Sequence, residues 1–208
     1  MRLAILGASG HGKVVADAAS LSGWVEIVFF DDAWPAVAKN GPWEVVGRSP
    51  DLLAKAAEFD GTVVAIGNNG IRMARQQELV SAGLKLISVI HPSAIVSPHA
   101  SVGAGSVVFA NAVINSCANL GAGCIVNTGA VVEHDCEVGD FSHLSPNAVL
   151  AGGVTAGQKV WVGAGAMVKQ LVVLGDEVTV GMGSVVLKDV AACKTVVGVP
   201  ARPVHFQD

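Results

Sequence analysis

The chain has no tyrosine, and phenylalanine and tryptophan together make up only 5% of its 208 residues. Charged residues are also scarce, at 14%, whereas hydrophobic residues reach 51% and the mean hydropathy is +0.55. Disordered chains have the opposite composition, so intrinsic disorder is excluded. Because a wide globular core usually contains more aromatic rings, we expect a narrow interior filled by aliphatic side chains.

The chain also lacks an excess of positive charge. Its formal net charge is −4 and its isoelectric point is near 5.8. This balance argues against binding nucleic acid or an anionic membrane along an extended surface. It does not exclude one local phosphate site.

Signals for export, membrane insertion and disulfide bonding are missing as well. Residues 100–132 carry no charge, but they contain too many Ser, Asn, Thr and Gly residues for a lipid-facing helix. The apolar start, residues 1–6, is too short for a secretory signal. The four cysteines form no CxxC pair, which is typical of free thiols in a reducing compartment. We therefore expect a cytoplasmic protein without a membrane span.

Residues 1–90 alternate between strand-like and helix-like segments. Short β-rich apolar runs predict strands over 3–6, 27–30, 62–66 and 86–90. Helices are predicted over 13–20, 49–58 and 71–82, the second with Ser49 as its N-cap. This alternation predicts a small Rossmann-like α/β domain with a parallel sheet.

Beyond residue 90 the sequence repeats every six residues. Seventeen consecutive sixth positions, from Ile90 to Val186, are all Val, Ile or Leu except Ala156. The position four residues after each aliphatic is small or Val, as in Ala112 and Cys124. One large and one small apolar position per hexad predicts a parallel β-helix over 91–208, ending in a C-terminal tail. Three hexads form one 18-residue coil, which gives between five and six coils.

Motifs in both parts carry a more specific resemblance. The first part contains Gly7-Ala8-Ser9-Gly10-His11-Gly12-Lys13, then Asp31-Asp32 and Gly67-Asn68-Asn69. The second contains Val126-Asn127-Thr128, Glu133-His134-Asp135-Cys136, Phe141-Ser142-His143 and Gly198-Val199-Pro200-Ala201. In this order they resemble the bacterial nucleotide-sugar acetyltransferases of the bacillosamine N-acetyltransferase and sialic-acid O-acetyltransferase group. The resemblance implies a left-handed β-helix, acetyl-CoA as acyl donor and a homotrimer with active sites between neighbouring subunits.

His134 lies in an unusual concentration of acidic residues. Four of the eight acidic residues in 91–208 fall within residues 133–140. One interpretation is a solvated turn with a surface histidine. The other is a general base oriented by an acid, either Asp135 or Glu133. Since His134 occupies neither apolar phase of its hexad, we expect its side chain to point out of the prism.

The resemblance assigns roles residue by residue. It implies that His134 is the general base and that Asp135 is its acidic partner, where the bacillosamine enzymes often have glutamate. It implies that acetyl-CoA is bound by His143, Gly152, Ala164 and Met182. It implies that the nucleotide-sugar is held by Ser9, Gly10, His11, Asp31, Asp32, Gly67 and Asn68.

Two other interpretations of the motifs are less consistent with the residues. Gly7, Gly12 and Lys13 match the start of a P-loop, but Val14 replaces the Ser or Thr that would bind Mg²⁺. A zinc site is not expected, because His134 and His143 are nine residues apart and the next histidine is His205.

The resemblance therefore implies an enzyme that uses acetyl-CoA to acetylate the 4-amino group of a nucleotide-linked, UDP-type, amino-deoxy sugar. O-acetylation of a sugar hydroxyl is the alternative within enzymes. A non-catalytic solenoid that binds a nucleotide is the alternative outside them, but it gives no role to His134.

Overall fold

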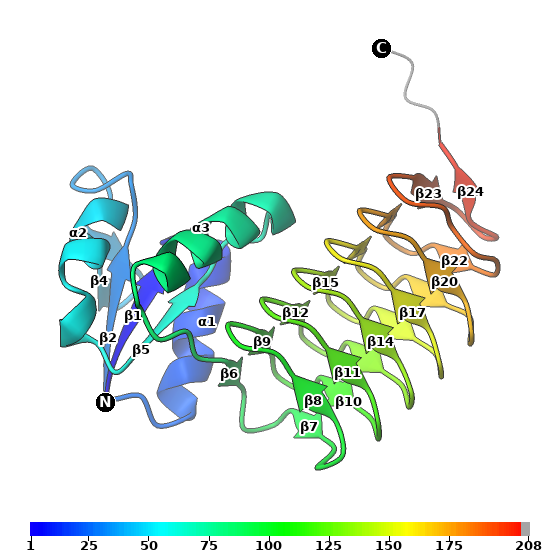
Figure 1. Cartoon of the computed structure of the whole chain (residues 1–208), viewed down its shortest axis with the longest axis horizontal. Coiled ribbons are helices and arrows are strands. Elements are labelled where there is room, and N and C mark those ends of the chain that lie inside the picture. Colours follow the sequence, from blue (N-terminus) through cyan, green and yellow to red (C-terminus); the bar gives the residue numbers. More distant parts are fainter. Residues whose placement is uncertain (205–208) are drawn as a thin grey trace.

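The computed structural model describes residues 1–204, so the predicted tail residue His205 lies outside the described residues. A small α/β domain is followed by a long parallel β-helix, and the described C-terminal end lies far from the α/β domain (Figure 1). Both parts of the predicted fold class are confirmed. None of the helices in residues 1–204 has the length and apolar character needed to cross a membrane.

The α/β domain is built on a three-stranded parallel sheet in the order β2-β1-β5. Its strands are β1 (Arg2–Leu6), β2 (Glu26–Phe30) and β5 (Gly61–Val64), close to the predicted ranges. The helices are α1 (Gly10–Leu21), α2 (Ser49–Ala54) and α3 (Asn69–Ser81), with a 3₁₀ turn, η1, at Ala56–Glu58. The strands are almost entirely buried, as expected for a parallel sheet covered on both faces.

Three local predictions for this domain were wrong. Residues 86–90 do not form one strand: the Ile87 N–H bonds to the first sheet, whereas the Val89 N–H bonds to the solenoid, so the run is divided between two sheets. The N-cap of α2 is Arg48 and not Ser49: Ser49 is already the first helical residue, and the Arg48 N–H donates to the Asp51 carboxylate (2.8 Å). The helix predicted to Glu58 ends at Ala54 and continues only as η1.

The α/β domain also contains a short β-hairpin that was not predicted from the sequence. The two strands of the hairpin are β3 (Lys39–Asn40) and β4 (Trp43–Glu44), paired antiparallel beside the edge strand β2.

The β-helix is a three-sided prism whose two-residue strands stack with an offset of 18 residues, the predicted coil length. We name its sides by what covers them. The apolar face contains β7 (Ile95–Val96), β10 (Val113–Ile114), β13 (Val131–Val132), β16 (Val149–Leu150), β19 (Met167–Val168) and β22 (Val185–Val186). The polar face contains β8 (Ser101–Val102), β11 (Asn119–Leu120), β14 (Glu137–Val138), β17 (Thr155–Ala156) and β20 (Val173–Leu174).

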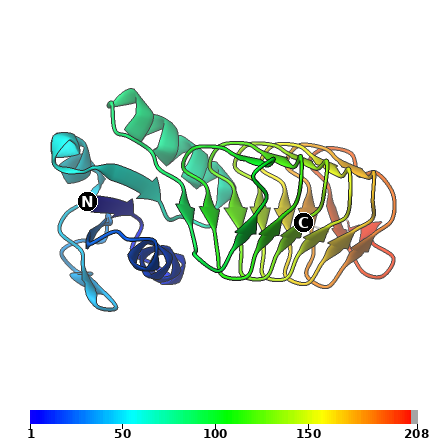
Figure 2. The same cartoon turned by 90° about the horizontal axis from the view of Figure 1, so that it is seen from below.

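On the third side, which we call the docked face, the α/β domain packs against the first strands of the β-helix. The docked face contains β6 (Val89–Ile90), β9 (Val107–Val108), β12 (Ile125–Val126), β15 (His143–Leu144), β18 (Trp161–Val162), β21 (Thr179–Val180), β23 (Thr195–Val197) and β24 (Arg202–Pro203). Outward residues of its first three strands, Val89, Val107 and Ile125, share one buried cluster with residues of β1 and α1. The two domains therefore have a common core, and Figure 2 shows them side by side.

The hexad phases fold as predicted. The second residue of almost every two-residue strand points inward, and the small position of the next hexad fills the remaining space, both with exposures near zero over most of the prism. Outward positions define the faces. On the apolar face they are all aliphatic, with Ile95 and Met167 more than half exposed.

Candidate functional site

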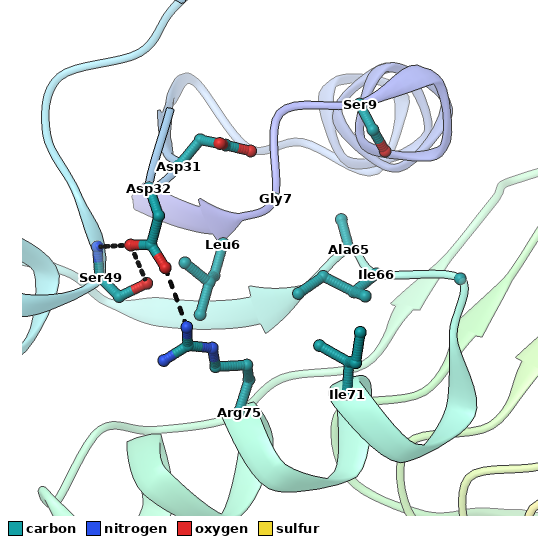
Figure 3. Close-up of a pocket in the computed structure, with 11 residues that line it drawn as sticks. Leu6, Gly7, Ser9, Asp31, Asp32, Ser49, Ala65, Ile66, Ile71 and Arg75 are labelled. Carbon is teal, nitrogen blue, oxygen red and sulfur yellow. Dashed lines mark hydrogen bonds and ion pairs between the residues drawn. The ribbon is translucent and has the colours of Figure 1, made fainter. Parts of the chain in front are cut away.

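A cavity of about 300 Å³ opens where the strands β1, β2 and β5 end (Figure 3). Carboxyl ends of parallel strands are the usual ligand edge of an open α/β sheet. Four predicted substrate-binding residues line this cavity: Ser9, Asp31, Asp32 and Gly67. The sequence analysis missed Ser49, Ile71 and Arg75, which also line it; they form no recognisable motif.

The two aspartates organise the walls of the cavity. Asp31 accepts hydrogen bonds from the backbone N–H groups of Ala8 (2.7 Å) and Ala33 (2.9 Å), so it fixes the loop after β1. Asp32 accepts from the Ser49 hydroxyl (2.7 Å) and forms an ion pair with Arg75 (2.9 Å). The bonds from Ser49 lower the pKa of Asp32, which therefore stays ionised at neutral pH.

The loop after β1 differs from a P-loop. Helix α1 begins at Gly10, so Gly12 and Lys13 lie within the helix and not in the loop. A Cβ on Gly12 would overlap the carbonyl oxygen of Gly7, which explains glycine at this position by close packing. Gly10 opens α1, while the Asn68 side chain caps α3 by accepting from Ile71 N–H (2.9 Å). Neither of these two predicted residues lines the cavity in this structure.

His11 and His143 lie in the seam between the two domains. The His11 ring packs edge-on against Phe109, at 5.5 Å between centroids, and the His143 ring stacks on Trp161 at 5.8 Å. Burial, aided by the Arg72 cation, lowers the pKa of His11 to about 4 and that of His143 to about 3. Both rings are therefore neutral, and each keeps one buried nitrogen without a hydrogen-bond partner.

The contact between His143 and Trp161 could have been predicted from the sequence spacing of the two residues. The two residues are 18 apart, so the predicted coil length already stacks one on the other. Asn127, one coil earlier, lies 3.3 Å from His143 Nε2 and belongs to a motif that was noted without a role.

His134 and Asp135 form an exposed pair at the corner between the apolar and polar faces. The His134 Nδ1 atom lies 2.7 Å from a carboxylate oxygen of Asp135, and both side chains are more than 60% exposed. Asp135 has φ of 59°, a left-handed corner conformation. Glu133 accepts from the His134 backbone N–H (3.3 Å) and not from the ring. The hydrogen bond that the Asp135 carboxylate accepts from the ring raises the pKa of His134 above its ordinary value.

Gly152 leaves space beside the other ring nitrogen of His134. It lies one coil further on, and a Cβ built there would stand 2.5 Å from Nε2. Any larger residue would overlap the imidazole ring of His134 and displace it. The predicted residues Ala164 and Met182 lie at a different corner, between the docked and apolar faces, where Met182 is 78% exposed.

Within one chain the structure does not bring all predicted site residues together. The α/β domain, its cavity and His143 belong to the docked face. His134 and Gly152 belong to the corner opposite that face in a three-sided prism. The predicted acid–base pair and the predicted nucleotide site are therefore on opposite sides of the same β-helix.

The cysteines offer no second catalytic group. Cys124 and Cys136 point into the prism, as predicted, and burial raises the pKa of both thiols, to about 11 for Cys124. Cys117 and Cys193 are exposed. In residues 1–204 no three His, Cys, Asp or Glu side chains gather in a way that would hold a metal ion.

Comparison with known proteins places this geometry among enzymes. Residues 2–79 match the family model of the PglD N-terminal domain. A UDP-N-acetylbacillosamine N-acetyltransferase of Bacillus subtilis (strain 168) is 36% identical over 115 residues, which cover half of each protein. The acetyltransferase domain of PglB from Neisseria gonorrhoeae FA1090, solved with acetyl coenzyme A, is 42% identical, covers 98% of each chain and has a TM-score of 0.94. PerB from Caulobacter crescentus, solved with CoA and GDP-perosamine, is 35% identical, with 99% of this chain and 98% of that chain covered and a TM-score of 0.94.

A PglD-type α/β domain joined to a hexapeptide β-helix defines a class of acyltransferases. The chain belongs to the family of acetyl-CoA-dependent nucleotide-sugar N-acetyltransferases represented by PglB and PerB. The resemblance inferred from the sequence is confirmed at this level.

Proposed function

We propose that this protein transfers the acetyl group of acetyl-CoA to the 4-amino group of a nucleotide-linked amino-deoxy sugar, with His134 as general base. One observation carries the proposal. At an exposed corner, the His134 ring is oriented by Asp135 at 2.7 Å through Nδ1, while Gly152 leaves Nε2 accessible. That is the arrangement an amine needs to give up a proton to an imidazole.

The chemistry requires no covalent enzyme intermediate. The bound donor supplies an activated acetyl thioester, and the amine forms a C–N bond to its carbonyl carbon as the C–S bond breaks. Nε2 of His134 takes the proton that the amine loses, and the resulting imidazolium can return it to the departing thiolate. Asp135 favours the tautomer with the proton on Nδ1 and stabilises the cation. The buried cysteines, with raised pKa values, are not available as thiolates.

The acceptor's nucleotide is assigned to the cavity at the sheet edge. Glycine at position 7 and the start of α1 allow backbone N–H groups to approach a diphosphate. Arg75 supplies a cation in the same cavity. A UDP-sugar is our first candidate, in line with the name of the B. subtilis relative. The PerB complex contains a GDP-sugar, so the base has to be tested directly.

A second subunit is needed to complete this site, and we propose the homotrimer that the resemblance implied. The apolar face lies between the corner of His134 and the corner of Ala164 and Met182. If that face turns toward a threefold axis, one corner of each copy meets the other corner of the next. His134 then approaches the donor-binding residues and His143 of a neighbouring protomer.

The experiment is a free-thiol release assay with acetyl-CoA and UDP-, dTDP- or GDP-linked 4-amino sugars. We expect rapid thiol release with one of the three and none with the matching 4-hydroxy sugar. Release only with the hydroxyl sugar would show O-acetylation. Nucleotide binding without any thiol release would favour the non-catalytic alternative.

A further inference from the structure

Arg72, on α3, is the largest fully buried side chain in residues 1–204, with 1% exposure. All five guanidinium N–H donors are used. On the side of the α/β domain, Nη1 donates to the carbonyl oxygens of Ile66 (3.0 Å) and Gly67 (3.1 Å). On the side of the β-helix, Nε donates to Gly123 (2.7 Å) and Nη2 to Phe141 (2.7 Å), and Nη2 also donates to the Asn69 side chain (2.8 Å).

These acceptors connect the two predicted binding regions. Ile66 and Gly67 line the nucleotide cavity. Phe141 lies two residues before His143, at the corner that leads into β15. One side chain thus bonds to a wall of the cavity and to two successive coils of the prism.

No carboxylate pairs with Arg72 anywhere in residues 1–204, so the guanidinium is held by neutral oxygens alone. A buried cation without a counter-ion is a costly way to join two domains, and an apolar contact would stabilise the seam at least as well. What the guanidinium adds is a rigid, planar set of donors with fixed directions.

Two neighbours on the same face of α3 extend this contact. Asn69 donates to the carbonyl oxygen of Lys159 (3.0 Å), and Gln76 donates to that of Ala104 (3.0 Å). The acceptors follow one corner of the prism over four coils. An adjacent face of the same turns of α3 is directed elsewhere: Ile71 and Arg75 point to the cavity at the sheet edge (Figure 3).

We propose that Arg72 is a positioning residue, which fixes the nucleotide cavity relative to the prism so that the bound sugar reaches the acyl-transfer site in the correct place. This inference rests on the proposed function. Without Arg72 the cavity loses the bonds to Ile66 and Gly67, but the contacts of Asp31, Asp32 and Arg75 remain, because none of them involves Arg72. Binding should survive while the placement of the amine is lost, and a misplacement of about 1 Å can cost roughly 100-fold in rate.

The test compares Arg72→Lys and Asn69→Ala with wild type, and uses Gln77→Ala as control because Gln77 is exposed on the same helix. Lysine keeps the charge but not the five directed donors. Nucleoside diphosphate is titrated by calorimetry to count binding-competent sites and obtain Kd, and kcat is expressed per such site. We expect Arg72→Lys to lower kcat about 10- to 100-fold with Kd changed less than about threefold. Asn69→Ala should act in the same direction more weakly, and Gln77→Ala should match wild type.

A purely structural role would lower the number of binding-competent sites and leave kcat per site unchanged, which would overturn the proposal. A Kd increase that accounts for the whole loss would also overturn it. If wild type transfers no acetyl group, the proposed function fails separately. Hydrogen exchange then still decides whether Arg72 holds the seam: Arg72→Lys should accelerate exchange in residues 66–72 and 123–125 but not in the loop 7–9, which has no hydrogen bond to the β-helix in residues 1–204, and the same change in both regions would contradict the proposal.

Discussion

At the scale of single residues, the exposed pair of His134 and Asp135 is the proposed centre of the chemistry. Its carboxylate accepts from Nδ1 at 2.7 Å, and this bond raises the pKa of the imidazole above 6.5. A raised pKa makes the ring a stronger base, but a smaller fraction of it is unprotonated at a given pH below that value. Glu133 lies beside the pair and bonds only to its backbone.

We predict that His134→Ala lowers kcat about 10²–10⁴-fold with little change in either KM, because a general base acts in the transition state and not in binding. In wild type, kcat should rise with pH as His134 loses its proton and level off above the raised pKa. Asp135→Asn should lower kcat less and shift the midpoint to lower pH, because it removes the bond that raises the pKa. Steady-state kinetics between pH 5 and 9 measure all three.

Glu133→Gln is the matched control, since it removes a neighbouring charge without touching the ring. Its effect on kcat should be smaller than that of Asp135→Asn. A near wild-type kcat in His134→Ala, or an acetylated cysteine trapped from the reaction, would rule out direct attack by the amine.

At the scale of secondary-structure elements, the carboxyl end of β2 holds together the cavity to which we assign the nucleotide. Asp32 follows this strand and bonds to the first residue of α2, Ser49, and to Arg75 in α3. The three elements meet at this one carboxylate (Figure 3).

We predict that Asp32→Ala raises the KM for the nucleotide-sugar about tenfold or more while the KM for acetyl-CoA stays near wild type. Losing the carboxylate removes the acceptor of the Ser49 hydroxyl and one of the two ion pairs of Arg75, which keeps only its contact with Glu78 (2.9 Å); Ser49 and Arg75 both line the cavity. Steady-state kinetics with each substrate varied in turn measure the effect. Equal losses for both substrates, with a lower melting temperature, would instead indicate a folding defect.

At the scale of the whole molecule, the three faces of the prism have different surroundings. One is covered at its beginning by the chain's own α/β domain, one is largely polar, and one is aliphatic in every outward position from Ile95 to Val185. A continuous exposed apolar face on a solenoid is typical of a surface buried by assembly.

We predict a mass in solution near three times 21.1 kDa by light scattering. Val149→Glu, in the middle of the apolar face, should dissociate the assembly and abolish acetyl transfer while leaving nucleotide binding intact. Thr155→Glu places the same charge on the polar face and should change neither. A fully active monomer would show that the site does not need a second subunit.

The sequence by itself determined the β-helix and its coil length. Inward and outward positions follow from a strict six-residue period, because a narrow prism admits only aliphatic and small side chains at two phases. It also identified His134 with its acidic neighbours, since charge is rare in this part of the chain. The three sheet strands of the α/β domain were predictable to within about two residues at each end, because short, fully buried parallel strands are continuous apolar runs.

Only the tertiary structure decided how these parts combine. The burial of Arg72 depends on contacts more than fifty residues away in the sequence. The division of residues 86–90 between two sheets depends on the docking of one domain on the other. The choice of Asp135 over Glu133 depends on a left-handed corner that turns one carboxylate toward the ring. The separation of His134 from the cavity at the sheet edge depends on which face of the prism the first domain covers. The sequence could not predict that face, because the six-residue period is the same for all three faces.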